Sequence, residues 1–146
     1  MKITLRGYYA MLALASMAGK GQNGGLVRLE EMTERHSIPE NFLLQIFQAL
    51  KRAGLVRSKR GVHGGFQLTR PPHRITLAEI IESVEGRILP GPLEERPEPT
   101  HRPESWRALD GFWEELRERV RGEVDAYTLA DLADRIHAPE SEMYHI

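Results

Sequence analysis

The stretch that decides the fold is ALKRAGLVRSKRGVHGGFQLTR, residues 49–70. Its first part, ALKRAGLV, is typical of a helix that ends at a glycine. Its second part, Ser58 to Arg70, holds three basic residues, three glycines, one histidine and one phenylalanine. A cationic, glycine-bent loop at this place fits a phosphate-binding enzyme, a metal site or a wing that lies along nucleic acid. The flanking sequence decides between these three.

Two short helices around a tight turn precede the loop. The first is expected at residues 29–35, and the turn at His36-Ser37-Ile38. The second is expected at residues 39–52, because apolar residues recur there at helical spacing. Its predicted inner face holds Phe42, Leu43, Ile46, Phe47 and Leu50. Its outer face holds Asn41, Gln45, Gln48 and Arg52. This pattern is typical of a helix-turn-helix.

Two strands are expected after it, at residues 55–59 and 66–70, with RGVHGG between them. A phosphate-binding enzyme loop would run from a strand into a helix N-terminus, and the sequence has neither GxxxxGK[ST] nor GxGxxG. We therefore favour a wing, with Lys59, Arg60 and His63 directed to the DNA backbone or a narrow minor groove. The alternative is a solvated hairpin tip whose charges maintain solubility.

Four further elements are expected. A helix at residues 5–18 is apolar nearly all round, which predicts burial on two sides, and a partner subunit is one candidate for the second side. A Thr76–Glu79 capping box opens a helix that Gly86 closes. After a proline-rich linker, a helix at about 104–125 carries a heptad seam that predicts a dimer contact. A short helix follows at 128–135. The seam comprises Trp106, Leu109, Trp113, Leu116 and Val120.

The composition narrows the class of protein. Residues 1–75 carry twelve Lys/Arg and four Asp/Glu, whereas residues 76–146 carry eight and seventeen, so a basic half is expected to face a polyanion. The 146 residues contain no cysteine, which excludes disulfides, thiol catalysis and thiolate-bound metal clusters. No apolar run is long enough to span a membrane, and Arg6, Tyr8 and Tyr9 speak against a signal peptide. A cytoplasmic location is expected.

Three blocks, LRGYYAMLAL, PENFLLQIFQALKRAGLVRSKRGVHGGFQLTRPP and ITLAEIIESVEG, resemble the IscR, NsrR and CymR family of bacterial winged-helix transcription regulators. The resemblance covers residues 1–86 closely, and the tryptophan-bearing helix is similar to the family's dimerisation helix. It implies a homodimer that binds an imperfect inverted repeat in double-stranded DNA, with recognition helices in major grooves and wings in minor grooves. It also implies DNA contacts from Asn41, Phe42 and Gln45, and a wing contact from Arg60.

The sequence departs from this family in two ways. Relatives that sense iron–sulfur status, nitric oxide or redox state hold a two-iron two-sulfur cluster on three cysteines, and residues 86–104 here contain none. Leu44 stands where a glutamate is common, so it could meet a thymine methyl or pack against a neighbouring side chain. A His101–glutamate metal site is a minor alternative. Regulation by a protein partner or by a small molecule at the tryptophan-bearing interface remains open.

The sequence therefore predicts a mainly α protein with a small β-hairpin wing: a winged helix-turn-helix plus a long C-terminal dimerisation helix. The expected parts are a DNA-binding domain at 1–86, a linker at 87–103, the dimerisation helix and a short helix at 104–136, and a tail at 137–146. The expected function is that of a homodimeric transcription regulator, a repressor without a cofactor, and not an enzyme. The rival hypothesis is a winged-helix protein–protein interaction module that acts through its acidic C-terminal half.

Overall fold

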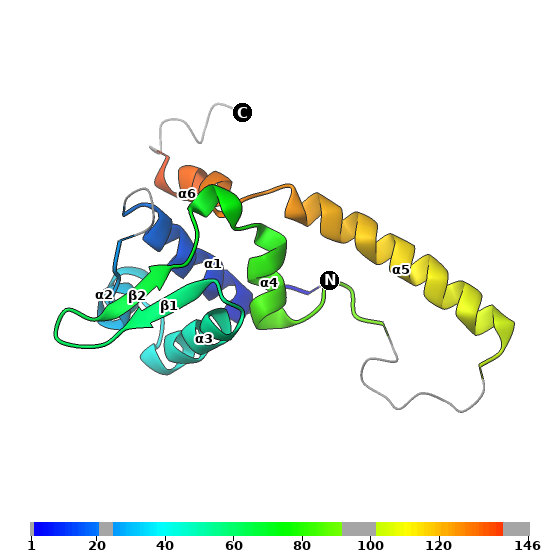
Figure 1. Ribbon diagram of the computed structural model, residues 1–146, viewed down its shortest axis with the longest axis horizontal. Coiled ribbons are helices and arrows are strands. Elements are labelled where there is room, and N and C mark those ends of the chain that lie inside the picture. The colour runs from blue at the N-terminus through cyan, green and yellow to red at the C-terminus, as the bar shows by residue number, and fades with distance from the viewer. Residues whose placement is uncertain (1, 21–24, 92–101, 139–146) are drawn as a thin grey trace.

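The computed structural model describes residues 2–20, 25–91 and 102–138. Helices α1 to α3 come first, then the hairpin of β1 and β2, then a 3-10 turn and helices α4 to α6 (Figure 1). Their bounds are α1 Leu5–Ala18, α2 Leu29–His36, α3 Glu40–Arg52, β1 Val56–Lys59, β2 Gly65–Leu68, η1 Pro72–Arg74, α4 Leu77–Glu85, α5 Glu104–Asp125 and α6 Leu129–His137. The expected mainly α fold with one antiparallel hairpin is confirmed.

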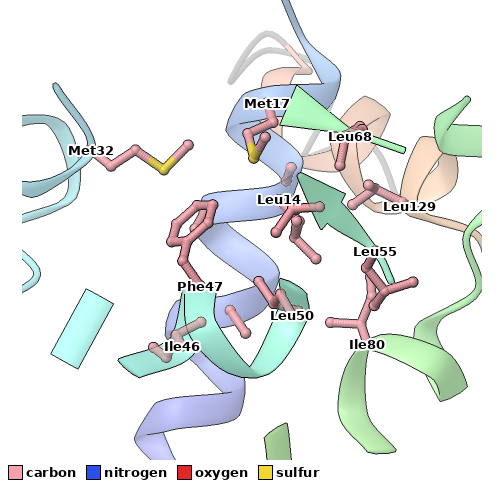
Figure 2. Packing of buried hydrophobic residues seen from close by; sticks show 14 of the residues in the cluster. Leu14, Met17, Met32, Ile46, Phe47, Leu50, Leu55, Leu68, Ile80 and Leu129 are labelled. Carbon is pink, nitrogen blue, oxygen red and sulfur yellow. The ribbon is translucent and has the colours of Figure 1, made fainter. Parts of the chain in front are cut away.

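The main core is built around α1. Leu14 and Met17 of this helix are fully buried, and they lie with Phe47 and Leu50 of α3 and with Leu129 of α6 (Figure 2). Helices α3, α4 and α6 all contact α1. A second side of α1 is covered by α6 of the same chain, whereas Leu5 and Tyr8 of α1 are exposed.

A smaller apolar cluster holds the C-terminal part of α5 against α4. Ala78 and Ile81 of α4 bury Ile88, and Val120 and Val124 of α5 pack against them. The beginning of the expected proline-rich linker is therefore packed on α4 rather than extended. The rest of that linker, residues 92–101, lies outside the described residues, as does the tail from residue 139.

One residue of the predicted inner face of α3 does not face inward. The buried stripe of α3 consists of Leu43, Ile46, Phe47, Ala49 and Leu50. Phe42 precedes this stripe by one residue, which turns its side chain about 100° away from Leu43. Its exposed fraction is 52%, so the prediction that Phe42 packs in the core is wrong.

Candidate nucleic-acid interface

The turn between α2 and α3 has a defined geometry. α2 ends at His36, and Ser37 adopts a left-handed conformation with φ 53° and ψ 36°. Ile38 is then completely buried, and Pro39 is the N-cap of α3. Since Ile38 anchors the turn to the core, the direction of α3 relative to α2 is fixed.

The outward side of α3 carries the polar side chains that the sequence assigned to DNA. Asn41, Gln45, Gln48 and Arg52 are all exposed, and the apolar side chains Phe42 and Leu44 are exposed between them. Amide and guanidinium groups can hydrogen-bond base edges or phosphates, and apolar groups can contact a thymine methyl. The helix therefore offers a surface of the kind that reads a major groove.

The hairpin forms a wing beside α3 (Figure 1). Val56 pairs with Leu68, and Lys59 pairs with Gly65. Lys51 of α3 donates a hydrogen bond from Nζ to Ser58 Oγ at 2.8 Å, which links α3 to β1. The predicted wing contacts Lys59, Arg60 and His63 are all exposed.

Residues before α2 hold the wing in place. The N–H groups of Val27 and Phe66 each donate to the other residue's carbonyl, at 2.9 and 2.8 Å, so Val27 adds a bridge to the edge of β2. The Arg28 guanidinium donates to the Val62 carbonyl at the tip. Gly65 has to be glycine, because a Cβ there would lie 2.6 Å from the Val27 carbonyl oxygen. Sequence reasoning missed Val27 and Arg28, since their partners lie more than 30 residues away.

Arg70 joins the end of the hairpin to α4. Its Nη2 donates to Glu79 Oε1 at 2.8 Å, and its Nη1 donates to the Arg74 carbonyl at 3.0 Å. Burial alone would raise the pKa of Glu79, but hydrogen bonds from the Thr76 backbone and from Arg70 together hold this pKa below its usual value. Glu79 is therefore ionised at neutral pH and keeps the pair intact.

The predicted dimer seam divides into two parts. Val120 packs on α4 within the chain, and Trp113 and Leu116 are half-buried. Leu109 is 63% exposed, and Trp106 is exposed as well. Phe112, also 63% exposed, was not in the predicted seam because its spacing does not fit the heptad. The exposed apolar surface of α5 thus consists of Trp106, Leu109 and Phe112.

The residues present do not fit an iron–sulfur cluster. Cysteine thiolates are the usual ligands of such a cluster, and the chain contains no cysteine. Within residues 2–20, 25–91 and 102–138, no three His, Asp or Glu side chains are placed to hold a metal ion. The proposed His101 site lies outside these ranges. None of the helices described there is long and apolar enough to cross a membrane.

An exposed polar helix that follows a fixed turn, with a cationic hairpin beside it, defines a winged helix-turn-helix protein. Residues 3–135 match the family model Rrf2, described as an iron-dependent transcriptional regulator. The chain belongs to this family of helix-turn-helix transcriptional regulators.

Several relatives are similar over most or all of the chain. The HTH-type transcriptional regulator CymR of Bacillus subtilis is 33% identical over 147 residues, with 100% of both chains covered. IscR of Cereibacter sphaeroides is 44% identical over 89 residues, which cover 60% of this chain and 57% of IscR. The solved structure of CymR, the global cysteine regulator of B. subtilis, has a TM-score of 0.70 at 32% identity, covering 92% of this chain and 98% of that one. These relatives are regulators, not enzymes.

Proposed function

We propose that the protein is a homodimeric, sequence-specific DNA-binding repressor that works without an iron–sulfur cluster. Each subunit inserts α3 into a major groove, where Asn41, Gln45, Gln48 and Arg52 meet base edges or phosphates, and Phe42 and Leu44 contact apolar groups of bases. Lys59, Arg60 and His63 of the wing approach the adjacent minor groove. Regulators of this class act on DNA in the cytoplasm.

The observation that carries this proposal is the joint exposure of the α3 polar face and the cationic wing. All nine side chains assigned to DNA are exposed, while the opposite face of α3 is buried in the core. Lys51 and Arg70 connect the wing to α3 and α4, so its orientation is fixed before DNA arrives. A preorganised surface loses less conformational entropy on binding.

The exposed surface of α5 supports the proposed dimerisation. Trp106, Leu109 and Phe112 lie on a helix that projects away from the rest of the chain (Figure 1). Large apolar groups exposed together are typical of an interaction surface. Two copies joined there would present two recognition helices to half-sites about 34 Å apart, which is one turn of DNA.

In this proposal, the protein does not sense its regulatory signal through a thiolate-bound cluster. The relative CymR is named a cysteine regulator, and we extend to this chain only the idea that an effector other than a cluster sets its activity. A protein partner or a small molecule that binds near α5 would act in this way. Arg121 and Asp125 connect α5 to Glu82 and Thr76 of α4, so a displaced α5 would disturb the DNA-binding half.

Selection of fragmented genomic DNA on the purified protein tests the proposal. The selection is performed at about 150 mM salt, where non-specific phosphate binding is suppressed. Enrichment of one two-fold-symmetric sequence, located upstream of a gene whose transcription rises when the protein is deleted, is the expected result. Binding that is equal for all fragments would contradict sequence-specific recognition, and lower transcription after deletion would contradict repression.

A further inference from the structure

We infer that Arg28 is the positioning residue of the wing: it holds the tip at the distance from α3 that simultaneous entry into both grooves requires. This role rests on the proposed function. Arg28 is the N-cap residue of α2, and its guanidinium donates to the Val62 carbonyl across 34 positions of the sequence. Among the residues that the structure describes, it is the one side chain before α3 that donates a hydrogen bond to the tip.

The tip needs such a support because its own residues provide few contacts that would fix its conformation. Gly61 has a φ of +111°, and Gly64 lies so close to the Lys59 carbonyl that a Cβ has no room. Between these glycines, the side chain of Val62 is 85% exposed. The ladder of β1 and β2 ends at the Lys59–Gly65 pair, so residues 60–64 lie beyond the last strand pair. A glycine-rich loop of this kind is mobile unless another group holds it.

Arg28 meets the tip next to a second anchor. Val27 is paired with Phe66, and the ring of Phe66 packs against that of Phe47 of α3, with centroids 4.5 Å apart and planes tilted by 39°. The path from α3 through Phe66 and Val27 to Arg28 therefore sets the position of Val62. His63 follows Val62 directly and Arg60 precedes it by two residues, so the contact that holds Val62 also constrains both predicted minor-groove side chains.

A competing role for Arg28 is a direct contact with a phosphate. The hollow between α2 and the wing measures about 390 Å³ and is lined by Arg28, Lys59 and the tip glycines, among others. Arg28 is exposed there and retains donors beyond the one used for Val62. The two roles predict different effects on DNA affinity. A positioning residue contributes to affinity only by orienting Arg60, whereas a phosphate contact contributes to affinity independently of Arg60.

The first experiment measures wing motion in the free protein. Amide order parameters of Val62 and His63 are compared between wild type, Arg28→Ala and Arg28→Lys. We expect values near 0.85 in wild type and below about 0.6 in Arg28→Ala. Arg28→Lys should recover part of the order, because an ammonium can still donate to the carbonyl. Unchanged order parameters in Arg28→Ala would overturn the inference. This experiment needs no DNA, so it decides the role of Arg28 even if no operator exists.

The second experiment is a double-mutant cycle with the selected DNA site. Arg28→Ala should weaken binding roughly tenfold, and the double variant with Arg60→Ala should bind about as well as Arg60→Ala alone. Losses that multiply would mean that Arg28 contacts DNA independently, which overturns the positioning role. Arg74→Ala removes the same charge from η1, and we expect it to change affinity by less than about twofold. Absence of any specific site for wild type would count against the proposed function, not against the wing measurement.

Discussion

Arg60 lies directly after β1, beyond the last strand pair, and its side chain is exposed. Side chains of this kind contribute little to folding and are available to bind. Each DNA-facing residue can therefore be tested by truncation without damage to the core.

Replacing Arg60 by alanine should cost about 1–3 kcal/mol of specific DNA binding, because an arginine in a narrow minor groove gains from its negative potential. Fluorescence anisotropy with the selected site, at several salt concentrations, measures both the affinity and the salt slope. Arg74→Ala serves as the charge-matched control. Unchanged affinity together with an unchanged salt slope for Arg60→Ala would remove the wing from the interface.

His36 is a half-buried titratable side chain at the end of α2, directly before the helix-turn-helix turn. Its Nε2 is hydrogen-bonded to Ser16 Oγ at 2.5 Å, and Ser16 is buried in α1. Burial lowers the pKa of His36 below its usual 6.5, and the charges of Arg35 and His137 lower it further. The folded protein thus prefers the neutral imidazole.

Stability should consequently fall as the pH drops below about 6.5. In that range the unfolded chain binds a proton at His36 that the folded chain refuses, so protonation favours unfolding. Urea unfolding at pH 7.5 and 5.5 measures the effect, with His36→Gln as the comparison. The variant should lose less stability between the two values. An equal loss in wild type and variant would show that His36 does not couple folding to pH.

At the scale of elements, helix ends are secured by distant side chains as well as local ones. The capping boxes Thr76–Glu79 and Thr128–Asp131 secure α4 and α6, as their sequence spacing indicates. The N-terminus of α1 instead uses Glu85 of α4. Glu85 Oε1 accepts hydrogen bonds from the Thr4 N–H at 2.8 Å, the Thr4 hydroxyl at 2.7 Å and the Gly7 N–H at 3.1 Å.

Glu85→Ala should lower the free energy of unfolding by about 0.5–2 kcal/mol, which is the usual cost of removing a helix cap. Chemical denaturation monitored by circular dichroism measures the change. Glu34→Ala, an exposed carboxylate on α2, is the control and should lie within about 0.5 kcal/mol of wild type. Equal stability of wild type and Glu85→Ala would mean that this cap contributes nothing.

Local signals predicted most elements, and distant contacts explain what they missed. The bounds of α1 and α5, the helix-turn-helix and the hairpin follow from spacing, caps and glycines within short windows. Glu85 and Thr4 are 81 positions apart, and Arg28 reaches Val62 only because the fold brings them together. Phe42 was predicted to face inward because it is apolar, although its angular position on the helix differs from that of the buried residues. The exposure of the polar candidate DNA contacts of α3 was predictable from amphipathicity, whereas that of Phe42 and the supports of the wing were not.

At the scale of the whole molecule, charge and shape distinguish the half proposed to bind DNA from the half proposed to dimerise. The basic first half contains α1 to α3 and the wing, and the acidic second half contains α4 to α6. α5 extends from this body with its apolar side chains exposed (Figure 1). A long helix with exposed phenylalanine, leucine and tryptophan is best stabilised by a second copy of itself.

Phe112→Asp should convert the proposed dimer into a monomer at micromolar concentration, because a carboxylate buried at an apolar interface costs about 2 kcal/mol or more. Analytical ultracentrifugation measures the mass, and circular dichroism checks that the DNA-binding half stays folded. Glu118→Ala, on the opposite side of α5, is the control and should remain dimeric. A Phe112→Asp variant that is still dimeric would exclude this side chain from the interface.

The central claim is that two copies of α3 read one symmetric site in adjacent major grooves. Methylation-interference footprinting of the selected fragment tests it most directly, with wild type and Gln45→Ala compared on the same DNA. We expect two tracts of guanines whose major-groove methylation blocks binding, about one helical turn apart, and loss of this interference at the same position in both half-sites for the variant. A single tract, or a pattern that Gln45→Ala leaves unchanged, would contradict the claim.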